Sequence, residues 1–268
     1  MQYTTLFNRL WDEYVTTNPT AAKIYNLFNT QGEKIENDHV AFRTFNNPLV
    51  SINVIAKPFL QAGYVPMDTY TFTDKMLEAI HLEIPDNPAA PKVFISQLLV
   101  QKFSDNFQRI INQLITSVSP DIYNHPELVL KGNIWGIPDF ENYEILRAES
   151  EYAAWLYVYG FRVNHFTVSV NSLKIYNTLE KVNQFLTQNG YRLNSAGGEI
   201  KGTPEMLLQQ SSTLADISEV NFLDGFHKIP SSYYEFALRY PDNNGVLYNG
   251  FIAKSADKIF ESTNYYQK

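Results

Sequence analysis

Three residues of this sequence could together hold a divalent metal ion: His39, His165 and Glu235. The two histidines stand near the start of the alternating stretches DHVAFRTF and VNHFTVSV, and the glutamate interrupts the largely apolar stretch YYEFALR. A buried carboxylate is costly unless it is paired, hydrogen-bonded or bound to a metal. Two neutral imidazoles and one carboxylate are the set that holds Fe(II) in non-haem iron enzymes, with coordination positions left open. These residues therefore predict a metal centre with room for a substrate.

Strand alternation supports the grouping. Alternate residues of a strand share a face, so His165 lies with Thr167 and Ser169, opposite three apolar residues. The same rule groups His39 with Arg43. We therefore expect both histidines to face a polar, hollow side of a sheet.

The same three residues are also compatible with structural roles or with a different chemistry. Each histidine taken alone is more often a structural residue, and Glu235 could pair with Arg239, which follows it on the same strand face. The ligand set does not choose its metal, so a lyase or isomerase that uses Zn, Ni or Mn would need the same residues. A non-catalytic ligand-binding protein could also retain the fold.

The sequence contains 5 histidines, and the other three fit a ligand role less well. His81 shares a strand face with Glu83 and is the strongest competitor. His125 lies in a loop before a proline, and His227 follows a predicted turn. We expect all three to have structural roles.

Arg43 is the predicted anion-binding residue. It lies four residues beyond His39, ~13 Å along the strand at roughly 3.3 Å per residue, which is too far to touch the metal. A guanidinium fork there suits the distal carboxylate of a bound acid, although a structural ion pair is the alternative. Gln209 and Ser211, which share one face of LLQQSSTLAD, are predicted to line the cavity near the substrate, with an exposed polar face as the alternative.

The ligands belong to two halves of similar order. Residues 36–102 are predicted to form a strand, a helix and two strands, and residues 161–268 repeat that order. Phe59 in FLQAGY and Phe185 in FLTQNGY lie equally far along the chain from the histidine of their own half. This pattern indicates an internal duplication.

The repeat also gives local predictions. The first helix should begin after Ser51, whose side chain can cap it, and the second should begin at Asn171 or Ser172. Aligning KVFISQLLV with SSYYEFALR places Gln97 roughly opposite Glu235, in an equivalent site that holds no metal.

Helices are predicted for much of the remaining chain. Residues 1–35 form a helical cap, residues 103–160 form a helical insertion between the repeats, and a helix ends the second module. The fold class is α+β, and residues 1–268 are predicted to form one metalloenzyme domain.

Composition excludes several other classes of site. The chain has no cysteine, which rules out disulfides, thiolate zinc sites and iron–sulfur clusters. With 21 Lys and Arg against 28 Asp and Glu, no basic surface for nucleic acid is expected. No segment resembles a signal peptide or a membrane span, so we expect a cytoplasmic protein without a membrane partner.

The stretches DHVAFRTF, VNHFTVSV, GGEIKGTPEMLLQQSSTLAD and YYEFALRYP occur in this order, and with them the chain resembles the 2-oxoadipate dioxygenase/decarboxylase family. That family is similar in architecture to the vicinal-oxygen-chelate proteins. The resemblance implies duplicated βαβββ modules whose curled mixed sheet surrounds a metal.

The resemblance also implies a reaction and its participants. By motif, the family's metal ligands fall on His39, His165 and Glu235, and its substrate-positioning arginine falls on Arg43. The implied partners are Fe(II), O₂ and a small 2-oxo dicarboxylic acid, with 2-oxoadipate converted to 2-hydroxyglutarate and CO₂.

Asn164 is a candidate to orient an imidazole. Longer relatives carry more sequence after the carboxylate ligand, so contacts from such a region cannot be assumed here. The oligomeric state is not readable from the sequence.

Overall fold

The computed structural model describes residues 2–252. Its α-helices are α1 (Tyr3–Thr17), α2 (Pro19–Thr30), α3 (Ile52–Gln61), α4 (Asp105–Thr116), α5 (Pro120–Tyr123), α6 (Phe140–Glu149), α7 (Glu151–Tyr159) and α8 (Leu179–Gln188). Its strands are β1 (Asn37–Phe45), β2 (Val65–Phe72), β3 (Leu77–Glu83), β4 (Lys92–Leu98), β5 (Val163–Ser169), β6 (Lys201–Thr203), β7 (Leu208–Ser212), β8 (Ile217–Phe222), β9 (Gly225–Pro230) and β10 (Tyr233–Arg239).

Eight strands form one curled sheet in the order β2-β3-β4-β1-β5-β10-β7-β6. Each half contains one parallel pair, β1 with β4 and β5 with β10, and the halves meet where β1 runs antiparallel to β5. The first half is a βαβββ module, and the second has the same order with the β8–β9 hairpin inserted before its last strand. The predicted fold class of duplicated βαβββ modules is confirmed.

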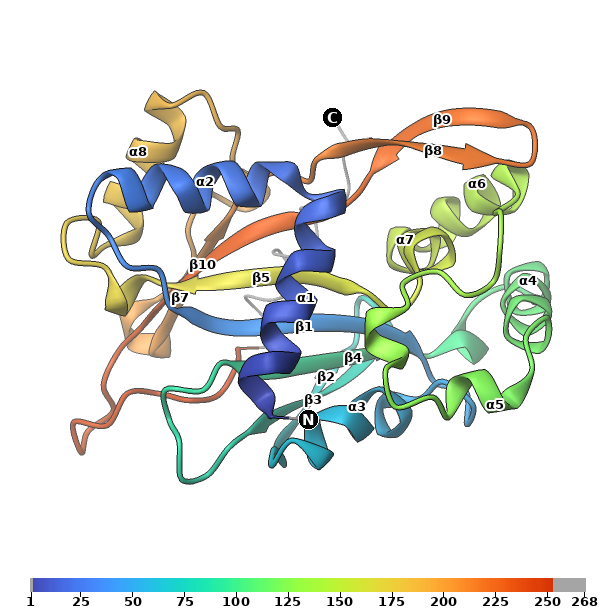
Figure 1. Cartoon of the computed structure of the whole chain (residues 1–268), viewed down its shortest axis with the longest axis horizontal. Coiled ribbons are helices and arrows are strands. Elements are labelled where there is room, and N and C mark those ends of the chain that lie inside the picture. The colour runs from blue at the N-terminus through green and yellow to red at the C-terminus, as the bar shows by residue number, and fades with distance from the viewer. Residues whose placement is uncertain (1, 253–268) are drawn as a thin grey trace.

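Helices cover the outer face of the sheet because its side chains are large and apolar. Aromatic rings from α1, α3 and α2 pack on that face, as in the pairs Trp11–Phe166, Phe59–Phe42 and Phe28–Phe236. Figure 1 shows α1 crossing in front of β1 and β5. The opposite, concave face carries the polar side chains of the candidate site.

The helices α4 to α7 gather at one end of the sheet, beside the β8–β9 hairpin (Figure 1). His227 of the hairpin stacks on Phe140 of α6, with ring centroids 3.5 Å apart. After α7 the chain passes so close to Gly132 that a Cβ atom at Gly160 would overlap the carbonyl of Gly132, and Gly160 also has a φ of +67°. Only glycine permits this crossing, which returns the chain to β5.

Several local predictions differ from the structure. The second-module helix α8 begins at Leu179, where Thr178 caps it through the amide of Lys181, because residues 170–172 form a single 3₁₀ turn. Ser51 precedes α3 but makes no side-chain capping bond. The first amide of α3, that of Ile52, donates to the side chain of Gln97 instead.

The sequence patterns also missed part of the sheet. β2, β6 and the β8–β9 hairpin were not predicted, since they are short, exposed or weakly alternating. The predicted C-terminal helix lies outside the described residues. Within residues 2–252, no helix combines the length and the apolar character that crossing a membrane requires.

Candidate metal centre

His39 on β1, His165 on β5 and Glu235 on β10 converge on the concave face of the sheet. One ligand atom from each residue lies within 4.8 Å of the others. The Nε2 atoms of His39 and His165 lie 3.5 and 3.3 Å from the two carboxylate oxygens of Glu235. All three side chains are buried. The structure therefore brings together the three residues that the sequence analysis selected.

The strand register explains why residues from distant parts of the chain meet here. Thr167 of β5 pairs with both His39 of β1 and Glu235 of β10, and His165 lies two residues before it on the same face. The three ligands therefore occupy adjacent strands in the middle of the sheet. Strands in the centre of a sheet are held on both edges, which fixes the ligand positions.

The electrostatics of the three residues suit a divalent cation. Burial lowers the pKa of both imidazoles, that of His165 well below its ordinary value, so both are in the neutral form that binds metals. Burial also raises the pKa of Glu235 to about 8. Among the described residues, no donor hydrogen-bonds to Oε2 of this carboxyl group. A cation bound between the three side chains would stabilise the carboxylate, so the donor set fits a metal.

The Nδ1 atoms of the two imidazoles have different partners. Nδ1 of His39 lies 2.7 Å from the carboxylate of Asp38, and Nδ1 of His165 lies 3.0 Å from the side-chain oxygen of Asn164. Such contacts orient an imidazole, and they leave Nε2 of each ring facing Glu235. The prediction for Asn164 agrees with this geometry, whereas Asp38 was missed. Strict alternation places Asp38 on the other face, but a register shift between Asn37 and His39 turns it towards the site.

The alternative pairing of Glu235 with Arg239 is wrong. Arg239 instead donates two hydrogen bonds to Asp38, at 2.6 and 2.8 Å. Burial disfavours the charged form of Asp38, but the guanidinium more than offsets this and lowers the pKa of Asp38 far below its ordinary value. The carboxylate of Glu235 is thus left for His39, His165 and the side-chain amide of Gln210.

Arg43 lies on the concave face, towards the end of the sheet that α7 closes. Its guanidinium lies 4.8 and 5.2 Å from the ring centroids of Tyr152 and Trp155, and 3.5 Å from the carboxylate of Glu151. Burial has the largest part in lowering the pKa of His165, and the positive charge of Arg43 lowers it further. Arg43 is therefore a buried cation near the metal centre, held by aromatic faces.

Gln209 and Ser211 do not line the metal side of the sheet, and this prediction is wrong. Their register partners on β10 are Leu238 and Phe236, which face away from Glu235. Gln209 accepts a hydrogen bond from Tyr240, and Ser211 donates to Asn183 of α8. The sequence analysis recognised that Gln209 and Ser211 share one face of the strand, but it assigned that face to the predicted substrate cavity, which was the wrong choice.

Gln210 takes the place that was predicted for its neighbours, because its Nε2 donates to Oε1 of Glu235 at 2.6 Å. We expect Gln210→Ala to weaken Mn²⁺ binding about ten- to hundredfold, as is usual when a group that orients a ligand is lost. Gln209→Ala is the matched control, since Gln209 lies on the other face, and it should leave the affinity unchanged. Calorimetric titration of both variants with Mn²⁺ tests this, and equal affinities would assign Gln210 no part in orienting Glu235.

The other histidines have structural partners, as predicted. His81 lies 2.8 Å from the hydroxyl of Tyr70 and 3.0 Å from Glu83. His125 accepts the amide of Glu127, and His227 contacts Asp224. None of the three belongs to the metal-binding group found among the described residues.

In the first module, the position that corresponds to Glu235 is occupied by a residue that cannot bind a metal. Two residues beyond His39, Ala41 pairs with Phe94 of β4, as Thr167 pairs with Glu235 in the second module. Phe94, and not Gln97, is therefore equivalent to Glu235. Gln97 bonds to Glu78 and to the amide that begins α3, on the outer side of the sheet. The predicted repeat alignment was wrong by an odd number of residues, which reverses the face.

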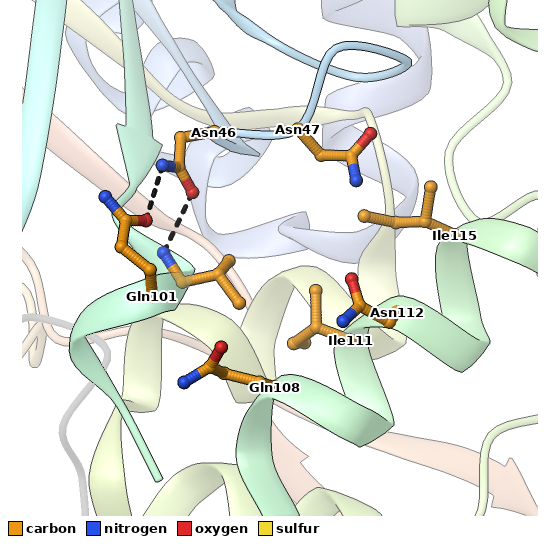
Figure 2. A pocket seen from close by; sticks show the side chains of 8 residues that line it. Asn46, Asn47, Gln101, Gln108, Ile111, Asn112 and Ile115 are labelled. Carbon is orange, nitrogen blue, oxygen red and sulfur yellow. Dashed lines mark hydrogen bonds between the residues drawn. The ribbon is translucent and has the colours of Figure 1, made fainter. Parts of the chain in front are cut away.

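A separate pocket of about 170 Å³ lies beyond the end of β1, away from the three ligands (Figure 2). Figure 2 shows Asn46 bonded to the side chain of Gln101. Asn46 also accepts a hydrogen bond from the amide of Val100. The lining residues carry no charge: Asn46, Asn47, Val100, Gln101, Gln108, Ile111, Asn112 and Ile115. This pocket lacks the cation that would recognise a carboxylate, so the metal centre remains the candidate site for an acid.

Comparisons with known proteins agree with the geometry. The sequence profile of the 2-oxoadipate dioxygenase/decarboxylase family matches residues 1–244. A chloroplastic 2-oxoadipate dioxygenase/decarboxylase from Arabidopsis thaliana is 39% identical, over 93% of this chain and 74% of the relative. The solved hydroxyglutarate synthase from Oryza sativa, in complex with 2-oxoadipate, is 36% identical, with a TM-score of 0.91 over 98% of this chain and 92% of that one.

Two further solved structures are similar to this fold. A protein from Shewanella frigidimarina NCIMB 400, provisionally named a hydrolase, is 50% identical, with a TM-score of 0.88 over 93% of this chain and 97% of that one. A protein from Ralstonia eutropha JMP134 assigned to the glyoxalase superfamily is 18% identical, with a TM-score of 0.74 over 90% and 83% of the two chains, and shows the fold alone. The chloroplastic name of the plant relative does not bear out a cytoplasmic location, which stays a prediction.

Proposed function

The chain belongs to the 2-oxoadipate dioxygenase/decarboxylase family, and from that premise we propose that it is an Fe(II)-dependent enzyme that oxidatively decarboxylates a 2-oxo dicarboxylic acid. The observation that carries the proposal is the buried set His39, His165 and Glu235 with a buried cation, Arg43, on the same face. 2-Oxoadipate is the first candidate substrate, since it is the acid bound in the rice relative.

The proposed reaction converts 2-oxoadipate and O₂ to 2-hydroxyglutarate and CO₂. The bond between the first carboxylate and the keto carbon breaks, and CO₂ leaves. One oxygen atom of O₂ enters the new carboxylate, and the other becomes the hydroxyl group on the neighbouring carbon. The acid itself supplies all four electrons, so no second 2-oxo acid is consumed. Bound Fe(II) would supply the redox chemistry that allows O₂ to react.

The residues of the chain hold and orient the acid in this proposal. The buried ligand residues exclude bulk water from the reacting end. Arg43 receives the distal carboxylate, and the rings of Tyr152 and Trp155 hold its guanidinium in place. The guanidinium also lies 3.5 Å from the carboxylate of Glu151, so binding of the acid would bring a second carboxylate to the same buried cation. These contacts fix which end of the acid lies at the metal.

The test is oxygen consumption by anaerobically purified, Fe(II)-loaded protein with a panel of 2-oxo acids of different length. We expect one O₂ consumed and one CO₂ released for each 2-hydroxyglutarate formed, with 2-oxoadipate the best substrate. Protein loaded with Zn²⁺ or Mn²⁺ should show no turnover. Turnover of a 2-oxo acid by those forms without O₂ would instead identify a lyase or isomerase of the same fold.

A further inference from the structure

The chain after β10 returns to the metal centre. Residues 240–251, here called the strap, turn at Asp242, whose side chain accepts the amides of Asn244 and Val246. The strap then comes back to the guanidinium of Arg239, which donates to the carbonyls of Tyr248 at 3.0 Å and Gly250 at 2.8 Å. Arg239 is buried, so these bonds fix the end of the strap against the sheet.

Phe251 at the end of the strap lies directly against a metal ligand. Its ring is perpendicular to that of His39, with centroids 4.8 Å apart, and it is buried. The same ring packs on Phe94 at 4.9 Å and on His81 at 5.4 Å. Its amide donates to the hydroxyl of Tyr70. Phe251 therefore covers part of the first-module half of the concave face and lies against one side of His39.

A second path joins the strap to the same ligand. The guanidinium that holds the carbonyls of Tyr248 and Gly250 also holds Asp38, and Asp38 contacts Nδ1 of His39 at 2.7 Å. Asp38 and Arg239 are both buried, so their charges interact with little screening by water. One cation thus orients the partner of a metal ligand and anchors the strap.

We propose that the seating of the strap and the binding of metal stabilise each other, with Arg239 and Phe251 as positioning residues that act through His39. This inference rests on the metal centre of the proposed function but on no particular reaction. Metal bound to Nε2 fixes the His39 ring, against which Phe251 packs and which Asp38 holds. A seated strap in turn keeps the ring in the orientation that binds metal. Such coupling is reciprocal by thermodynamic necessity.

The strap also sets a direction for the substrate. Phe251 and Arg239 close the side of the metal centre at which β1 begins, whereas Arg43 lies four residues beyond His39, towards the end of β1. An acid bound at the metal therefore extends towards Arg43. The strap and Arg43 thus lie on opposite sides of His39 along β1.

The first measurement uses Phe251→Ala and Phe251→Leu in the full chain, titrated with Mn²⁺ by calorimetry. We expect the alanine variant to bind Mn²⁺ about ten- to hundredfold more weakly, and leucine, which refills most of the volume, to recover most of the affinity. Phe226→Ala is the matched control, because Phe226 lies on the β8–β9 hairpin and is 70% exposed. Wild-type affinity in Phe251→Ala would overturn the proposal. If this variant does not fold, the second measurement decides, because it uses the wild-type chain.

The second measurement is limited proteolysis with chymotrypsin, followed by mass spectrometry of cleavage at Tyr248 and Phe251, with and without Mn²⁺. In the wild type, we expect saturating Mn²⁺ to slow strap cleavage at least tenfold, and more than cleavage at Phe226. Asp38→Asn should lose this selective protection even when it is saturated with Mn²⁺. Equal protection at all sites would show general stabilisation and overturn the coupling.

The two measurements separate the coupling from the proposed function. Neither contains a 2-oxo acid or O₂, so a failed oxygenase assay leaves both results standing. A wild-type chain that binds no Mn²⁺ would overturn the metal centre and the coupling together. A wild type that binds Mn²⁺ while strap cleavage and Phe251→Ala affinity are unaffected would overturn the coupling alone.

Discussion

Glu235→Ala is expected to abolish stoichiometric binding of Fe(II) and to lower turnover at least about a thousandfold, while the chain stays folded. A bound metal is worth several kcal/mol to the reaction, and ~4 kcal/mol corresponds to roughly a thousandfold. The fold should survive because burial raises the pKa of Glu235 and disfavours its carboxylate, so the substitution removes a charge that is unfavourable there without metal. Metal analysis, circular dichroism and oxygen consumption measure the three parts of this prediction.

The same loss is expected for His39→Ala and His165→Ala, since two remaining ligands hold a labile divalent ion poorly. His227→Ala is the control histidine, because it lies on the β8–β9 hairpin and contacts Asp224 and Phe140 instead of the ligands. It should bind metal and turn over as the wild type does. Full metal occupancy in any one of the three ligand variants would remove that residue from the metal centre.

Arg43→Ala is expected to discriminate between substrates and not between metals. The variant should retain Fe(II) and lose about ten- to more than hundredfold in kcat/KM for 2-oxoadipate, since a charge-assisted contact is worth about 1.5 to 3 kcal/mol. The loss should be much smaller for a 2-oxo acid of similar length that lacks the second carboxylate. Parallel kinetics with 2-oxoadipate and 2-oxohexanoate measure the difference.

The buried surroundings of Arg43 set a necessary control. Its guanidinium packs on Tyr152 and Trp155, so its removal leaves a cavity that could disturb α7. Arg43→Met keeps most of the volume without the charge and should show the same discrimination. Equal losses on both acids would mean that Arg43 binds the shared 2-oxo end or supports the fold, and the dicarboxylate assignment would lose its residue-level support.

The sequence by itself was enough to select the candidate metal ligands and to predict the duplicated fold. His39, His165 and Glu235 were recognisable because strand alternation has a period of two, which separates a polar face from an apolar one without knowledge of the partner strands. The equivalent positions of the two histidines in the halves added a signal that packing alone does not produce. The identity of the family rested on motifs of the same stretches.

Only the tertiary structure decided which face of each strand carries the candidate metal ligands and which residues contact them. Gln209 and Ser211 were assigned to the wrong face, because a shift of one residue reverses a strand and LLQQSSTLAD is polar on both faces. The prediction for Gln97 was wrong for the same reason. The contact of Asp38 with His39 depends on a register shift in β1, and the other partner of Asp38, Arg239, lies far along the chain. Such pairings exist only once the sheet has closed, since sequence patterns record the period of a strand but not the neighbours that it meets.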